Sequence, residues 1–265
     1  MKIIDFNTIS NLNISAIQAI DWVEHILLKK YECELPAKIS MKMPEDVFIN
    51  TMPSSIPEEK RHGVKIVSRY PLRTPSLVSE IILYDSVAGE TLALMDGTWI
   101  TAMRTGAVAA LSIKKLQATQ AAQYAFMGLG NTARATLICL SEILGNKDLN
   151  IKLLAYKKQE KDFITRFKDY PNLHFTVCDN TKDLVFGSDI IVSSITSADG
   201  LIAPDEYFKE GCVVIPIHTR GFQNCDLFFD KVFADDTAHV KEFKYFSRFK
   251  QFNEFSKVLL GVVTG

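Results

Sequence analysis

The chain has 265 residues, of which 47% are hydrophobic and 23% are charged, and its formal net charge is −1. This composition is ordinary for a globular protein, and the near-zero charge argues against nucleic acid or an anionic membrane as a partner. The five scattered cysteines have no C-x-x-C spacing, which argues against a disulfide framework and against a metal site. No apolar run approaches the roughly 18 residues of a membrane-spanning helix, and the first residues lack a signal-peptide layout. We therefore expect a cytoplasmic protein.

Residues 1–118 are predicted to form an α+β domain that receives the substrate. Apolar residues recur at helical spacing from Ile14 to Leu27, after a start signal at residues 13–15. Small residues over 98–116 predict a second helix, with Thr98 as its N-cap. Strand patterns lie between these helices, at residues 34–43, 47–52, 63–71, 79–85 and 90–97. The last two form a predicted hairpin with its turn at 86–89, and a proline- and charge-rich connection is expected at 53–63.

Residues 128–133 have the form G-x-G-x-x-A, a variant of the dinucleotide-binding fingerprint. An apolar strand pattern precedes them, and a helical pattern with Ala133 and Leu137 on one face follows. Gly128 would allow the tight turn, and Gly130 would let the backbone approach a pyrophosphate at the helix N-terminus. The alternative is a glycine turn that only joins a buried strand to a helix; the flanking pattern favours the cofactor.

The alternation of strands and helices continues after the fingerprint. Further strands are expected at 151–156, 173–178, 188–195, 211–217 and 231–236. This order predicts a parallel, doubly wound α/β sheet of the Rossmann type over residues 119–265. Ligands bind such sheets at the carboxyl ends of the strands, so Thr196 and Ser197 are candidates to line the cofactor, although a polar loop that only turns the chain is an equal alternative.

Lys157 and Lys158 follow the second predicted strand. An NAD site usually has an acidic residue there to bind the ribose 2′-hydroxyl, whereas cations suit a 2′-phosphate. The sequence therefore favours NADP, with NAD as the other possibility. Two lysines that simply face solvent at a strand end are the alternative.

The stretch LMDGTWITAMRTGA at 94–107, together with GVKIVSRYP at 63–71 and FMGLGNTARATL at 126–137, resembles the ornithine cyclodeaminase/mu-crystallin family. The resemblance covers nearly the whole chain. It implies an NAD(P)-dependent oxidoreductase acting on a small amino or imino acid, and a homodimer formed through the substrate domain. Members of this family usually continue for several dozen residues back into that domain, so the resemblance implies that this return is missing from the sequence here.

The resemblance also implies roles for individual residues. Arg104 matches the arginine that binds the substrate carboxylate, a task that suits its planar fork. Lys65 matches a lysine that contacts the substrate, and Lys38 stands where the family often has a second carboxylate-binding arginine. The expected cofactor-binding residues are Ser76, Thr105, Gly128, Leu129, Gly130, Asn131, Thr132, Tyr156, Lys157, Lys158, Ser194, Ile195 and Thr196.

The main departure from the family pattern is IHTRG at 217–221. Cyclodeaminases have a general acid/base aspartate in this region, and Arg220 stands there instead; an arginine cannot act as that base. His218 titrates near neutral pH and is a second catalytic candidate, and Asp226 is another carboxylate nearby. Three hypotheses follow: an imine reductase or amino-acid dehydrogenase, an ornithine cyclodeaminase, and a protein that binds NADPH without turnover. The departure favours the first.

Overall fold

The computed structural model describes residues 1–117, 120–195, 202–217 and 225–265. Its chain divides into two compact units, which are described separately: unit 1 holds residues 1–15 and 25–102, and unit 2 holds residues 16–24 and 103–265. Helices α2 (Ala16–Leu28) and α3 (Thr98–Leu116) contribute to both units. The assignment of substrate to residues 1–118 and of cofactor to residues 119–265 remains a prediction.

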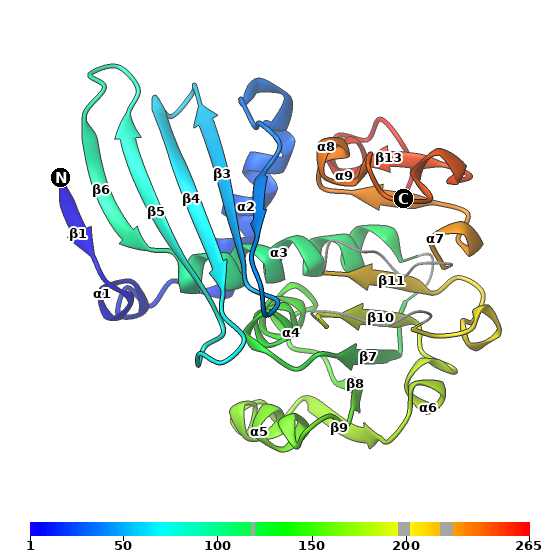
Figure 1. The fold of residues 1–265 in the computed structure, drawn as a ribbon. Helices are drawn as coiled ribbons and strands as arrows, with labels where there is room; N and C mark the ends of the chain where they lie inside the picture. The colour runs from blue at the N-terminus through cyan, green and yellow to red at the C-terminus, as the bar shows by residue number, and fades with distance from the viewer. Residues whose placement is uncertain (118–119, 196–201, 218–224) are drawn as a thin grey trace. The chain divides into compact units, whose positions relative to one another are not determined.

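A six-stranded sheet in the order β1-β6-β5-β4-β3-β2 dominates unit 1 (Figure 1). β1 pairs with β6 in parallel, and the other neighbours are antiparallel. The predicted β5–β6 hairpin is confirmed, with its turn after Asp85. The elements are β1 (Lys2–Ile4), α1 (Phe6–Ser10), the 3-10 turn η1 (Lys30–Glu32), β2 (Ile39–Lys42), β3 (Phe48–Ile56), β4 (Arg61–Arg69), β5 (Leu77–Asp85) and β6 (Thr91–Asp96).

The prediction of a connection over residues 53–63 is wrong. β3 continues through Pro53 and pairs with β4, so that only residues 57–60 form the turn. The Ser55 N–H donates to the Glu34 carbonyl oxygen (2.9 Å), on the side away from β4. Because N–H directions alternate along a strand, the missing N–H of Pro53 faces that same edge, beyond the end of β2, where proline is tolerated.

The predicted N-cap of α3 is also corrected. Thr98 is the first helical residue, and its N–H donates to Asp96 Oδ1 (2.7 Å). The Thr98 hydroxyl instead accepts from the N–H of Ser79 (3.4 Å). Asp96 therefore satisfies an N–H group that the start of the helix would otherwise leave unpaired.

Unit 2 contains a five-stranded parallel sheet in the order β11-β10-β7-β8-β9, which Figure 1 shows from β11 above to β9 below. The chain runs from β7 outward to β9 and then returns to the other side of β7 for β10 and β11. This is the doubly wound α/β fold that the sequence predicts. The elements are β7 (Gln123–Met127), α4 (Asn131–Ile143), β8 (Leu149–Leu154), α5 (Gln159–Arg166), β9 (Leu173–Cys178), α6 (Thr181–Val185), β10 (Ile190–Ser193), η2 (Asp205–Tyr207) and β11 (Val213–Pro216).

The strand expected at 231–236 exists as β12 (Val232–Ala234), but it does not extend the parallel sheet. It pairs with β13 (Phe252–Glu254) in a separate two-stranded sheet. The remaining elements of unit 2 are α7 (Cys225–Phe228), α8 (Thr237–Val240), η3 (Phe246–Arg248) and α9 (Phe255–Leu259). Across the described ranges of the chain, no helix has both the length and the apolar character to cross a membrane.

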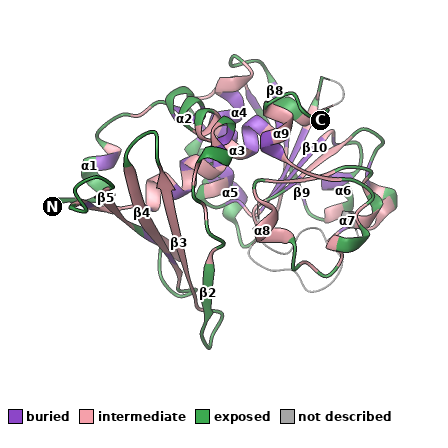
Figure 2. Ribbon diagram, turned by 90° about the horizontal axis from the view of Figure 1, so that it is seen from above, coloured by how far each residue is buried: buried purple, intermediate pink, exposed green. Residues whose placement is uncertain are grey.

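The buried residues gather around the parallel sheet and α4, coloured purple in Figure 2, whereas β3 and β4 are almost entirely of intermediate exposure. β10 is buried at every position, as expected for a parallel strand covered on both faces. The fully buried large side chains include Phe126, Leu137, Leu153 and Ile190. The parallel sheet thus offers a rigid frame for groups at its carboxyl edge.

Candidate cofactor and substrate site

The glycine turn lies where the two halves of the parallel sheet diverge. Gly128 follows β7 with φ of +77°, a left-handed conformation that favours glycine. A Cβ at this position would lie 2.5 Å from the backbone atoms Ile195 N and Ser194 C, which follow the neighbouring strand β10. The Ser194 N–H also donates to the Met127 carbonyl oxygen (2.8 Å). Glycine is therefore required both by conformation and by the close approach of two strand ends.

The next part of the turn is open. Gly130 precedes the first residue of α4, and a Cβ added to it would meet no atom within 4 Å. The first N–H groups of a helix have no partner within the helix and favour an anion. Close by in the fold, the Ser194 hydroxyl is buried and has no hydrogen-bond partner in the described part of the chain. A ligand with phosphate oxygens fits this combination of open space and unpaired donors.

The end of β8 is occupied by Tyr156, Lys157 and Lys158. Both lysines have positive φ, 50° and 66°, and the Lys157 ammonium lies 5.0 Å from the centre of the Tyr156 ring. The buried Glu160 accepts from the Tyr156 N–H (3.2 Å), so this acid is already engaged by the backbone. The end of the second strand of the βαβ unit therefore presents cations, as the sequence predicts.

Arg104 lies on α3, two residues before Gly106, where this helix crosses α4. A Cβ on Gly106 would lie 2.5 Å from the Ala135 carbonyl carbon and 2.6 Å from Thr136 N, so the two helices cross almost backbone to backbone. The half-buried Arg104 has a buried Nε without a hydrogen-bond partner among the described residues. Burial lowers the pKa of Arg104, and the negative charge of Asp235 opposes that change.

Asp235, directly after β12, is a candidate site residue that the sequence reasoning missed. Burial raises its pKa, but the nearby His239 side chain and the charge of Arg104 outweigh this, so the pKa of Asp235 is lowered overall. Its Oδ1 lies 3.8 Å from His239 Nδ1, and the carboxylate side chain is 46% exposed, so water screens its charge. No sequence signal marked it, because the predicted strand at 231–236 includes Asp235, whereas the observed β12 ends at Ala234.

Lys65 and Lys38 both belong to unit 1. Lys65 lies in β4 opposite Met52 of β3. Extending the β2–β3 register by one residue also places Lys38 opposite Met52. Residues opposite one another in adjacent strands share a face of the sheet, so the two lysines are on the same face, two strands or roughly 10 Å apart. Ser76, also in unit 1, precedes β5, and its carbonyl accepts from the Tyr70 N–H (2.8 Å).

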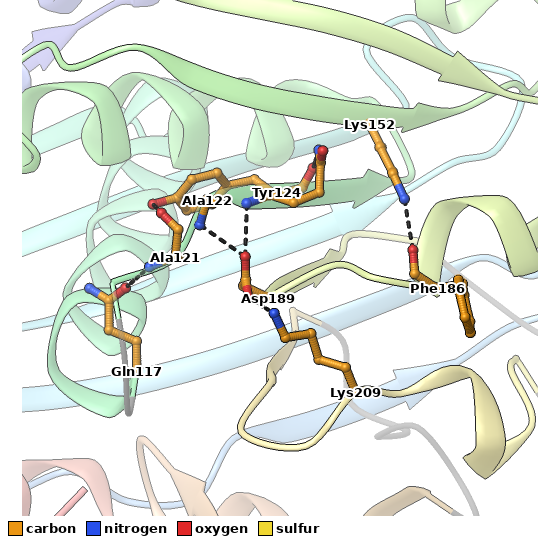
Figure 3. Close-up of polar contacts among 9 residues, drawn as sticks. Gln117, Ala121, Ala122, Tyr124, Lys152, Phe186, Asp189 and Lys209 are labelled. Carbon is orange, nitrogen blue, oxygen red and sulfur yellow. Dashed lines mark hydrogen bonds and ion pairs between the residues drawn. The ribbon is translucent and has the colours of Figure 1, made fainter.

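Asp189 holds the amino-terminal edge of the parallel sheet (Figure 3). Its Oδ2 accepts from the N–H groups of Ala122 and Gln123, both at 2.9 Å, and Lys209 pairs with Oδ1. These contacts keep the start of β10 beside the start of β7. They support the sheet on the edge opposite the glycine turn.

Four predicted residues lie outside the described ranges: Thr196, Ser197, His218 and Arg220. Asp226 falls within α7, but its side chain is also outside the description. Thr105 is on α3, next to Arg104, and Leu129 and Thr132 flank the open part of the glycine turn. The roles of all these residues remain predictions.

The parallel sheet with its glycine turn and helix α4 defines a Rossmann-type α/β protein, joined here to a mainly antiparallel unit. The chain belongs to the ornithine cyclodeaminase/mu-crystallin family, whose model matches residues 4–239. The predicted family and fold class are thus confirmed.

Individual relatives share the sequence at moderate identity. The nodulation efficiency protein NfeD of Rhizobium meliloti is 25% identical over 251 residues, covering 88% of this chain and 75% of that protein. The ketimine reductase mu-crystallin of Mus musculus is 29% identical over 168 residues, or 62% of this chain; the match spans about half, 52%, of the mouse protein. The solved Δ(1)-pyrroline-2-carboxylate reductase of Thermococcus litoralis, in complex with NADH and L-proline, has the same fold. It superposes with a TM-score of 0.86 at 23% identity, covering 100% of this chain and 88% of that one.

Proposed function

We propose that the protein is an NAD(P)H-dependent oxidoreductase that reduces a small α-imino acid to the amino acid. The observation that carries this proposal is the tight crossing of α3 on α4 at Gly106. It fixes α3, the helix that carries Arg104, against the helix that begins at the glycine turn, with Arg104 on a different face of α3 from Gly106. A carboxylate-binding arginine and a cofactor turn are thereby built into one rigid pair of helices. Imine reduction is also the activity named for the mouse relative.

The residues present fit the cofactor. The open space at Gly130, the first N–H groups of α4 and the buried, unpaired Ser194 hydroxyl would hold the pyrophosphate region. Lys157 and Lys158 support NADP over NAD, because the position usually taken by an acidic residue is cationic. When bound, the reduced nicotinamide supplies the hydride.

The protein then has to hold the substrate. Arg104 binds its carboxylate with the planar guanidinium, and the charge of Asp235 favours the charged form of that guanidinium. Lys65 and Lys38 share one face of the six-stranded sheet in unit 1, and their proposed role as substrate contacts rests on the resemblance to the family. A substrate with a carboxylate next to its C=N bond suits the guanidinium of Arg104. A ring-closing deamination would need a general base that Arg220 does not provide.

Reduction activity is tested with NADPH and a panel of imines. We expect NADPH oxidation with cyclic or linear α-imino acids and none with imines that lack the carboxylate. Arg104→Gln should lower kcat/KM roughly tenfold to a hundredfold, the effect of losing charge-assisted hydrogen bonds, while leaving NADPH affinity unchanged. Release of ammonia and proline from ornithine without net NADPH oxidation would instead establish cyclodeamination.

A homodimer through unit 1 is part of the proposal. Pro53, Val64, Ile82, Leu94 and Ile3 lie opposite one another in adjacent strands and so form one apolar row on one face of the sheet. None of them is buried, and Ile3 is 79% exposed. An apolar row of this extent on an exposed sheet face is typical of an interaction surface. The surface suits a second copy of the chain, and an Ile82→Glu variant should be monomeric by light scattering if it does.

The cytoplasm is the proposed compartment, on the sequence evidence of scattered cysteines.

A further inference from the structure

Arg166, the last residue of α5, reaches across to the start of α4. Its Nη1 donates to Asn131 Oδ1 (3.2 Å), and Asn131 is the first helical residue after the glycine turn. Both side chains are exposed. Within the described part of the chain, Arg166 has no acidic partner, so this guanidinium is held in place by a neutral amide and keeps its full charge.

Lys157 and Lys158 border the same place. They follow β8, and Asn131 follows the turn after β7; because β7 and β8 are adjacent and parallel, the two segments leave the same edge of the sheet. Neither lysine forms an ion pair with a described residue. Both backbones are in the left-handed conformation, which is uncommon for residues other than glycine and asparagine. The topology therefore brings three cations, none of them in an ion pair with a described residue, to the edge between β8 and the first turn of α4.

An anion bound at this edge would be attracted by all three charges. A hydrogen bond between an exposed guanidinium and an amide contributes little, whereas a guanidinium binds a phosphate through two parallel hydrogen bonds. In doubly wound folds the ribose nearest the fingerprint lies at the end of the second strand, and a nearby arginine can accept its 2′-phosphate. Asn131 pre-positions the arginine, since an arginine already held in a defined place loses less freedom on binding.

We propose that Arg166 determines the preference for NADP over NAD by binding the 2′-phosphate together with Lys157 and Lys158. This inference rests on the proposed cofactor site and adds a residue that is distant in sequence from the fingerprint. The lysines act as point charges, and the arginine adds the planar fork that recognises the phosphate geometry.

The test is binding of four probes by calorimetry: NADPH, NADH, adenosine 2′,5′-bisphosphate and adenosine 5′-monophosphate. We expect Arg166→Gln to weaken NADPH and the bisphosphate roughly tenfold to a hundredfold and to leave NADH and the monophosphate within about twofold. Arg166→Lys should recover only part of the loss, because it restores charge without the fork. Arg134→Gln is the control, since Arg134 is an exposed arginine in the same helix, α4.

The binding results distinguish an error in the role of Arg166 from an error in the proposed cofactor site. Equal weakening of NADPH and NADH would overturn the proposal, because it would assign Arg166 to the pyrophosphate. Unchanged affinity for all four probes in Arg166→Gln, with the unmodified protein binding NADPH, would also overturn it. Failure of the unmodified protein to bind any of the probes would refute the proposed cofactor site itself.

Discussion

Replacing Gly128 by alanine measures how tightly the glycine turn is built against β10. Two costs act at this position: an L-residue at φ of +77°, and a Cβ placed 2.5 Å from backbone atoms of Ser194 and Ile195. The first costs about 1–2 kcal/mol, and the second adds about 1–3 kcal/mol because backbone has to move. The expected loss in free energy of unfolding is therefore about 2–5 kcal/mol.

Gly145→Ala is the matched control. Gly145 has φ of +70°, but a Cβ there would meet nothing within 4 Å. This variant should lose only the conformational part, about 1–2 kcal/mol. Urea unfolding followed by circular dichroism gives both values, and NADPH titration should show weaker binding for Gly128→Ala alone. Equal destabilisation by the two substitutions would refute the reasoning that the turn is fixed by its close approach to β10.

Three further predictions concern charged groups. Asp189→Ala should destabilise the protein by about 1–3 kcal/mol at pH 7 by removing the acceptor for two backbone N–H groups. Burial raises the pKa of Asp189, but Lys209 and those N–H groups outweigh it and lower the pKa overall. Its contribution is therefore present above the ordinary carboxyl pKa and lost as pH falls through the lowered one, so the difference from the unmodified protein should shrink below about pH 4. Lys152 donates to the Phe186 carbonyl oxygen (2.8 Å; Figure 3) and to the Asp183 carbonyl oxygen (2.9 Å). Lys152→Met should therefore speed amide exchange in α6, and unchanged exchange would contradict this. Asp235→Asn should raise KM for the imino acid roughly twofold to fivefold and leave NADPH affinity unaltered. The effect is modest because the carboxylate is partly exposed. A loss of NADPH affinity would place Asp235 at the cofactor instead.

The fold of the parallel sheet was predictable because each of its strands is an apolar run bounded by turn residues. β7, β8 and β10 are buried at half or more of their positions, so their apolar runs identify them as strands without knowledge of their partners. Pairing was less predictable. β12 resembles the other strands, yet its partner is Phe252–Glu254, a segment with no strand pattern. The three residues of β1 are too short for a periodicity to show.

In the candidate site, too, local features could be predicted from the sequence, whereas contacts between distant residues could not. The glycine turn could be predicted because a positive φ and a close backbone approach both demand glycine at a fixed spacing. The interaction of Arg104 with Asp235 and the hydrogen bond of Arg166 with Asn131 join residues that are far apart in the chain. Only the packing of helices and strands brings such residues together, so no local sequence pattern predicts these contacts.

The most direct measurement follows the hydride itself. NADPH carrying deuterium at the transferred position of the nicotinamide is incubated with the protein and an α-imino acid, and the product is examined by mass spectrometry. The proposed function predicts one deuterium on the α-carbon of the product amino acid, with matching loss of NADPH absorbance. Product formed without deuterium, or no product from any α-imino acid while NADPH is bound, would contradict it.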